Sequence, residues 1–233
     1  MFDRPRDFKI LSPSQHFFFM KKLKSHALTA FLSLLPIFGL LAGNIPTSTV
    51  YRLNERGNLT AVEFSYTNIG NILKIKLNPD GTVNAKAQGT GAISYYGVGA
   101  GLYKEGKLKE IAGLKVDYYG LGAATHLQGK LKSIGDIQFT YFSPNGFSHI
   151  QGKVKSIGNI NIDYNRFGDE KGMIAKIGDS KLTYCFGLWK DTKICQIGQT
   201  KLEYYGIGNP NNLKGKVSEV KNWDPYVKVE IEL

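Results

Sequence analysis

Lysine side chains recur at regular intervals and are the first candidates for binding chemistry. Two series have a spacing of 23 residues, namely Lys107, Lys130 and Lys153, and Lys109, Lys132 and Lys155. On the polar face of a sheet they would form two basic rows able to bind an anionic polysaccharide or another anionic polymer of a cell envelope. The same rows would also act as a solvated face that pairs with acidic residues and discourages aggregation through sheet edges. The sequence leaves both interpretations open.

Three tyrosines follow the same rhythm and are further candidates for binding: Tyr118, Tyr141 and Tyr164. If they faced solvent, they would form an aromatic ladder that stacks on sugar rings or on a polymer. Tyr141, however, lies on the same side of its predicted strand as Ile137 and Phe139. This parity favours buried rings with their hydroxyl groups at the rim of the core.

Residues suited to catalysis are scarce after residue 43. The histidines there are His126 and His149, and neither stands beside a serine, cysteine or carboxylate in a known nucleophile motif. Two imidazoles without a third ligand make a poor metal site. The glycine-rich stretch 97–101 lacks the helix and the Lys-Ser/Thr pair of a phosphate-binding loop. We therefore predict no catalytic residues, no metal site, no cofactor and no enzyme activity.

The chain contains two cysteines, Cys185 and Cys195, which are ten residues apart. An even, closely spaced pair in an oxidising compartment is a disulfide candidate. Without a CxxC partner, two thiols at this spacing do not make a zinc site. The pair is therefore predicted to bridge two neighbouring strands.

The N-terminal segment has the pattern of a secretory signal. The basic cluster 20–24 precedes an apolar run, 27–42, which is shorter than the roughly 20 residues of a membrane-spanning helix. We interpret residues 20–43 as a signal peptide, with an uncleaved anchor as the alternative. Residues 1–19 are interpreted as a non-translated or disordered extension, and residues 44–233 as a single β-repeat domain. The predicted location is secreted or periplasmic.

The charge of the chain suits a polyanionic partner. The full sequence has a formal net charge of +11, and residues 44–233 have 24 basic and 17 acidic side chains, a net +7. An excess of this size fits an anionic polymer or an envelope surface, and it is also ordinary for an exported protein. Nucleic acid is not a predicted partner, because export takes the protein away from it.

The elements that must position these residues are short strands. The phrase Ile134–Tyr141 returns from Ile157, Ile177 and Ile197, and looser copies start at Ile69, Gln88, Ile111 and Val220. A period near 20 residues is typical of repeat architectures. Apolar and polar residues alternate within each copy, and no stretch of residues 44–233 has a helical period. We predict an all-β antiparallel meander of about eight hairpins of 20–23 residues, forming one curled or elongated sheet that stays open or closes into a barrel.

Two kinds of connection alternate along this meander. A tight one contains Gly135 and Asp136, and a longer one follows each strand that ends in tyrosine. A three-residue tight connection, pairing Leu131 with Phe139, would keep the two faces pure, and we prefer it to a two-residue turn. The glycine could instead mark a bend in one continuous strand. The stretch 62–66 is the predicted first strand, and 226–233 is the predicted closing strand.

The rhythm resembles the tyrosine–aspartate (YD) hairpin repeats of bacterial surface and toxin-shell proteins. The motifs that carry the resemblance are Ile162-Asp163-Tyr164-Asn165, Val116-Asp117-Tyr118-Tyr119 and Leu202-Glu203-Tyr204-Tyr205. The turn Leu77-Asn78-Pro79-Asp80-Gly81 is similar to that of choline-binding-type wall repeats. These resemblances imply a hairpin architecture at a bacterial surface, and they transfer no active-site residue.

From these features we predict a non-enzymatic exported protein of the bacterial cell envelope. Its expected role is structural, or that of a binding module for cell-wall or other anionic polysaccharide or for a protein partner. A small outer-membrane β-barrel and an envelope polysaccharide hydrolase are the alternatives. An open meander also leaves sheet edges through which the protein could self-associate.

Overall fold

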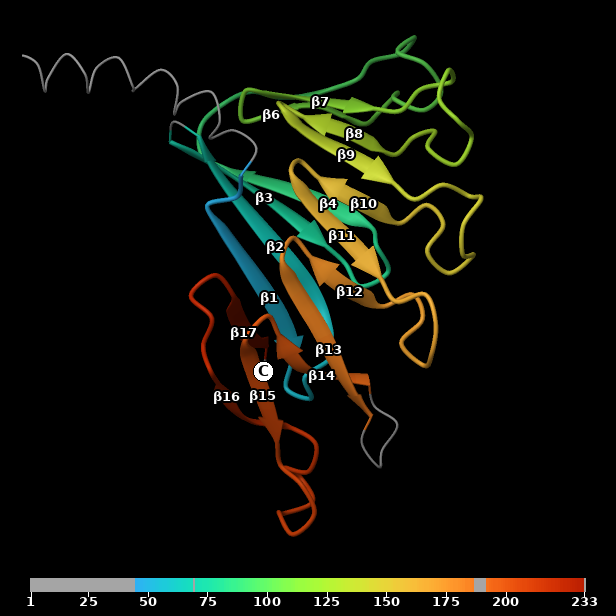
Figure 1. Ribbon diagram of the computed structural model, residues 1–233. Coiled ribbons are helices and arrows are strands. Elements are labelled where there is room, and N and C mark those ends of the chain that lie inside the picture. Colours follow the sequence, from blue (N-terminus) through green and yellow to red (C-terminus); the bar gives the residue numbers. More distant parts are fainter. Residues whose placement is uncertain (1–44, 69, 187–191, 233) are drawn as a thin grey trace, which may run out of the picture. The chain divides into compact units, whose positions relative to one another are not determined.

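The structure, a computed structural model, describes residues 45–68, 70–186 and 192–232 (Figure 1). The predicted signal peptide, the extension before it and Ile69 lie outside these residues. Residues 43–233 form one compact unit. The described residues form seventeen strands and no helix, which confirms the all-β prediction. Among them there is accordingly no helix long and apolar enough to cross a membrane.

Five strands form the first sheet, called here the base sheet. They are β1 (Ser48–Asn54), β2 (Leu59–Asn68), β3 (Asn71–Leu77), β4 (Val83–Gln88) and β17 (Lys228–Glu232). Their order is β17-β1-β2-β3-β4, and every neighbouring pair is antiparallel except β1 and β17, which are parallel. The predicted closing strand therefore exists, and it lies beside the first strand of the described chain.

The other twelve strands form the second sheet, called here the meander sheet. They are β5 (Ile93–Tyr95), β6 (Leu108–Ile111), β7 (Leu114–Tyr118), β8 (Leu131–Ile134), β9 (Ile137–Tyr141), β10 (Val154–Ile157), β11 (Ile160–Tyr164), β12 (Ile174–Ile177), β13 (Ser180–Phe186), β14 (Thr192–Ile197), β15 (Thr200–Tyr204) and β16 (Val217–Lys221). They follow one another in chain order, with β5 and β16 as the edges. The antiparallel meander is thus confirmed, and the chain divides its strands between two sheets.

The tight connections of the meander sheet differ from the predicted ones. Ile134 pairs with Ile137, so the loop contains two residues and the predicted pairing of Leu131 with Phe139 is wrong. The faces stay pure because β8 contains a bulge: Leu131 pairs with Tyr118 and Ser133 with Asp117, which leaves Lys132 as an extra residue. Gly135 has a φ of +54°, as the first central position of a type II′ hairpin turn requires.

The two sheets share one apolar core. Tyr51, Phe64 and Ile75 of the base sheet are buried in the same cluster as Phe139 and Ile162 of the meander sheet. On the outer side of β9, Gln138 and Thr140 are exposed, which matches the period-two pattern of the sequence. Apolar burial of this kind contributes roughly 25 cal/mol per Å² and is the main force that holds the sheets together.

Backbone hydrogen bonds also join the sheets, and each uses a residue next to a bulge. Val154 donates to the Gly81 carbonyl at 3.1 Å, and Ile194 donates to the Gly57 carbonyl at 3.0 Å. Val217 donates in the same way to the Glu55 carbonyl at 2.8 Å. A bulge interrupts the ladder, so it frees an N–H group to reach outside its own sheet. The hairpin loops of the base sheet are therefore docked at fixed points of the meander sheet.

Candidate functional site

The first lysine series lies within the fold and forms a ladder. Each ammonium donates a hydrogen bond to a glycine carbonyl of the following hairpin and also lies over a tyrosine ring. Lys107 donates to the Gly129 carbonyl at 2.5 Å and lies 5.0 Å from the centroid of the Tyr118 ring. Lys130 donates to the Gly152 carbonyl and lies 4.9 Å from the centroid of the Tyr141 ring. Lys153 donates to the Gly172 carbonyl at 2.6 Å and lies 5.0 Å from the centroid of the Tyr164 ring. A polymer would have to displace these contacts to reach the three ammonium groups.

A fourth lysine extends the ladder outside the 23-residue spacing. Lys193 donates to the Gly215 carbonyl at 2.7 Å and lies 5.2 Å from the centroid of the Tyr204 ring. In the hairpin between, Met173 stands where the other hairpins have lysine. Burial lowers the pKa of Lys130 and of Lys153. The ladder thus links consecutive hairpins through charge-assisted hydrogen bonds and cation–π contacts.

The predicted tyrosines point into the core, as their parity indicates. Tyr164 is buried, while Tyr118 and Tyr141 are partly buried. The Tyr141 hydroxyl donates to the Leu131 carbonyl at 2.8 Å, whereas no hydrogen-bond partner of the Tyr164 hydroxyl is found among the described residues. Burial raises the pKa of all three. The rings therefore serve as platforms for the lysine ladder.

The second lysine series faces solvent. Lys109, Lys132 and Lys155 are exposed and occupy the bulge positions of β6, β8 and β10. Lys132 forms an ion pair with Asp117 at 3.3 Å. Within the described part of the chain, Lys109 and Lys155 have no ion pair. The bulge explains the exposure, because it adds an outward residue without disturbing the inward ones.

Lys155 borders a hollow of about 530 Å³ on the meander sheet, called here the basic hollow. Arg166 and Lys176 contribute two more positive charges to it. Lys176 stands directly opposite Lys181 in the pairing of β12 with β13. Like charges opposite one another are destabilising. Lys176 also forms an ion pair with Asp179 at 3.9 Å, which offsets part of this repulsion. The remaining lining residues are Phe142, Asn159, Asn161, Ile162, Asp163, Gly178 and Asp179.

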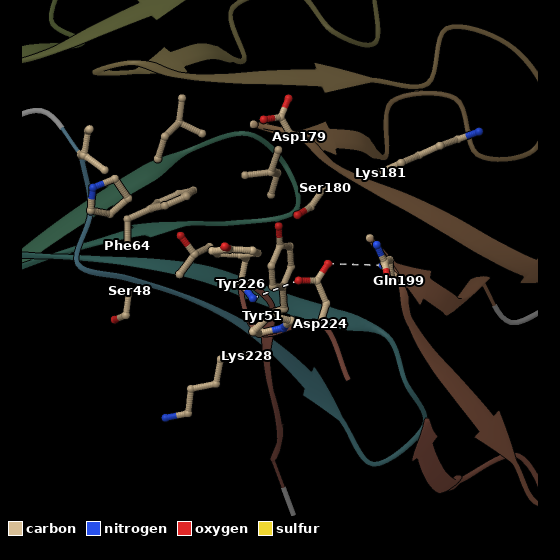
Figure 2. Close-up of a pocket in the computed structure, with 18 of the residues that line it drawn as sticks. Ser48, Tyr51, Phe64, Asp179, Ser180, Lys181, Gln199, Asp224, Tyr226 and Lys228 are labelled. Atoms are coloured by element: carbon tan, nitrogen blue, oxygen red, sulfur yellow. Dashed lines mark hydrogen bonds between the residues drawn. The ribbon is translucent and has the colours of Figure 1, made fainter. Parts of the chain in front are cut away.

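A larger hollow, called here the aromatic cleft, has a volume of about 1110 Å³ and lies between the start of β1 and the turns of the meander sheet (Figure 2). Trp223 and Tyr226 line it and are 72% and 87% exposed. Polar groups accompany these rings, which suits a ligand with both apolar faces and hydroxyl groups. The polar lining residues are Thr47, Ser48, Thr49, Asp179, Ser180, Lys181, Gln199, Asp224 and Lys228.

The floor of the aromatic cleft is fixed by hydrogen bonds. Figure 2 shows the Tyr51 hydroxyl pointing toward Ser180, and burial raises the pKa of Tyr51 to about 12. The Asp224 carboxylate accepts the backbone N–H of Tyr226 at 2.9 Å, and the Asp224 N–H donates to the Thr200 hydroxyl at 2.9 Å. Asp224 thereby holds the segment that bears both exposed aromatic rings against the meander sheet.

The two hollows adjoin at one turn. Gly178 and Asp179, the turn between β12 and β13, line both of them. A ligand longer than one hollow could therefore pass over this turn. Of the residues around these hollows, Lys155 is predicted from the sequence, whereas Trp223 and Tyr226 are not, because these two rings lie in a segment that occurs once. The available signal was the aromatic-rich run Trp223-Asp224-Pro225-Tyr226.

The predicted disulfide is present. Cys185 of β13 and Cys195 of β14 are joined, with their Cα atoms 5.5 Å apart. Among the residues that the structure describes, no three His, Cys, Asp or Glu side chains gather as a possible metal site. Comparison with protein-family models, with curated proteins and with solved structures finds no match for this chain.

Proposed function

We propose that residues 44–233 are a non-enzymatic binding module of the bacterial cell envelope that holds an acidic glycan chain across the β12–β13 turn. The observation that carries the proposal is that the aromatic cleft and the basic hollow share Gly178 and Asp179. The signal-like N-terminal segment supports export. The disulfide is compatible with an oxidising compartment.

The two hollows divide the recognition between them. In the aromatic cleft, the exposed faces of Trp223 and Tyr226 would stack on the C–H faces of sugar rings, while Gln199 offers an amide to their hydroxyl groups. In the basic hollow, Lys155, Arg166 and Lys176 would pair with carboxylate or phosphate groups further along the chain. No step of this recognition requires bond making or breaking.

Titration calorimetry with two polysaccharides, one containing uronic acid and one neutral, tests the proposal. We expect the purified protein to bind the acidic one more tightly, with an affinity that falls as salt rises because exposed charges are screened. Trp223→Ala should weaken binding to both polymers. Lys176→Ala should weaken binding to the acidic polymer alone, and this difference should shrink at high salt.

The matched control is Lys201→Ala. Lys201 is exposed and borders neither hollow. This change removes the same charge elsewhere on the meander sheet and should leave the affinity within about twofold. If Lys201→Ala and Lys176→Ala lowered the affinity equally, the loss would come from the change in net charge alone, and the assigned site would be wrong. The absence of binding at low salt would overturn the function.

A further inference from the structure

The basic hollow follows β11 from one end of the strand to the other. Asn159, in the two-residue turn before β11, lines one end of it, and Arg166, in the loop after β11, lines the other end. Between them, the exposed residues Asn161 and Asp163 line it from the outer face of the strand. A strand of five residues spans roughly 17 Å. The basic hollow therefore reaches from the tight-turn edge of the meander sheet to the edge that bears the long loops.

The two strands beside β11 place positive charges on either side of this path. Lys155 of β10 and Lys176 of β12 both line the basic hollow, and β10 and β12 are the two neighbours of β11 in the sheet. Lys176 stands directly opposite Asp163 in the pairing of β11 with β12. An extended polymer that lay along β11 would pass between the two lysines, so acidic groups spaced along it could meet both.

A pair of aromatic rings stands at the loop end of the basic hollow. The Arg166 guanidinium lies over the Phe147 ring, 5.9 Å from its centroid. The Phe147 ring also meets the Phe167 ring edge to face, with centroids 5.1 Å apart, and the His149 ring at 5.7 Å. Phe147 belongs to the loop after β9, and Arg166 and Phe167 to the loop after β11. These contacts hold the two loops together where the basic hollow ends.

Packing within the chain accounts for one of these rings and leaves the other open. Phe147 contacts two rings and a guanidinium and is 38% exposed, whereas Phe167 is 74% exposed. A single exposed apolar residue needs no explanation. Phe167, however, is fixed by a second ring and directly follows Arg166, which lines the basic hollow. It therefore offers a stacking face at this end, as Trp223, which is 72% exposed, does in the aromatic cleft.

We propose that Phe167 and Arg166 form a third subsite for the acidic glycan, beyond the basic hollow. This inference rests on the proposed function and gives the path of the bound chain. The glycan runs from the Trp223 ring over the turn 178–179, follows β11 and ends on the Phe167 ring. Phe147 is a positioning residue, because it holds both Arg166 and Phe167. Only a glycan long enough to cross β11 reaches both aromatic ends, so the site selects polymers over short fragments.

Titration calorimetry with an octasaccharide of uronic acid units tests the third subsite. Phe167→Ala should lower the affinity about fivefold, which corresponds to the loss of one aromatic contact. Leu121→Ala is the matched control, because Leu121 is 68% exposed on another long loop and borders neither hollow. This control should leave the affinity unchanged. Equal affinities of Phe167→Ala and the unchanged protein would overturn the third subsite and leave the proposed function standing.

A fluorescent reporter shows whether the glycan reaches this ring. In a chain whose Trp189 and Trp223 are replaced by phenylalanine, which keeps an aromatic ring in the aromatic cleft, the octasaccharide should shield Phe167→Trp from quenching by acrylamide. Leu121→Trp in the same background should stay unshielded. Binding of the octasaccharide without shielding of Phe167→Trp would overturn the third subsite alone. If the unchanged protein does not bind the octasaccharide at low salt, the proposed function and the third subsite are both wrong.

Discussion

Replacing Lys130 by methionine tests whether the lysine ladder stabilises the fold. Methionine is the residue that the chain itself has at the equivalent position, Met173, so the change keeps an apolar stem of similar length. It removes the hydrogen bond to the Gly152 carbonyl and the charge that lies 4.9 Å from the Tyr141 ring centroid. It also leaves the Gly152 carbonyl without its ammonium donor.

The expected loss follows from these two contacts. A hydrogen bond from a charged donor contributes about 1.5–3 kcal/mol, and a cation–π contact about 0.5–1 kcal/mol. Fixing a lysine side chain costs up to about 1.5–2 kcal/mol of conformational entropy, which the methionine variant partly recovers. We expect a net destabilisation of about 2 kcal/mol. For a domain of this size, this lowers Tm by about 4–8 °C.

Thermal unfolding followed by circular dichroism measures the effect, and Lys155→Met is the control. Lys155 is exposed and has no ion pair among the described residues, so its replacement should change stability by less than about 0.5 kcal/mol. Equal midpoints for the two variants would refute the reasoning, because the ladder contacts would then add nothing beyond those of a surface lysine.

Three further predictions concern the base-sheet loops that pack on the meander sheet, the disulfide and the buried tyrosines. Gly57→Ala should lower Tm more than Gly70→Ala. Both glycines have a φ near +80°, but a Cβ at Gly57 would strike the Tyr204 ring, while one at Gly70 would meet nothing within 4 Å. Equal losses of Tm would argue against the packing of the β1–β2 loop on the meander sheet. Replacing Cys185 and Cys195 by alanine should cost about 2–3 kcal/mol, and an unchanged calorimetric midpoint would contradict this. Burial raises the pKa of Tyr51 to about 12, above its unfolded value, so the stability it confers is complete below pH 10 and is lost as pH rises toward 12. Tyrosine absorbance at 295 nm should therefore rise in a late phase that coincides with unfolding, and a single early phase in a folded protein would refute it.

The sequence predicts the strands well because their signal is local. Ile137, Phe139 and Tyr141 alternate with polar residues, and this pattern is enough to assign β9 and the side of it that is buried. The predicted pairing has no bulge at Lys132, although two successive polar residues between Leu131 and Ile134 break the alternation and mark it. The predicted three-residue turn is wrong for the same reason. The bulge keeps the apolar side chains of β8 and β9 on one face, so a two-residue turn is enough.

What the sequence does not predict depends on partners that are distant along the chain. Lys130 and Lys132 are the same residue type two positions apart, yet the Lys130 ammonium is held over a tyrosine ring and the Lys132 side chain faces solvent. The signal that could have separated them is the Gly-Lys dipeptide, because the ladder lysines Lys107, Lys130 and Lys153 each follow a glycine. Trp223 and Tyr226 lie in a segment that occurs once, so the recurring pattern of the sequence does not point to them.

The parallel pairing of β1 with β17 delays the completion of the base sheet until the end of the chain has been synthesised. Thr60 and Glu232, whose side chains are hydrogen-bonded at 2.9 Å, are 172 residues apart. A ribosome adding about 5–20 residues per second needs roughly 10–30 s to make that interval. Throughout it, β1 has an edge without its partner. The base sheet therefore cannot be completed while the chain is being synthesised, which leaves a long period in which the protein is still open to chaperones and to transport.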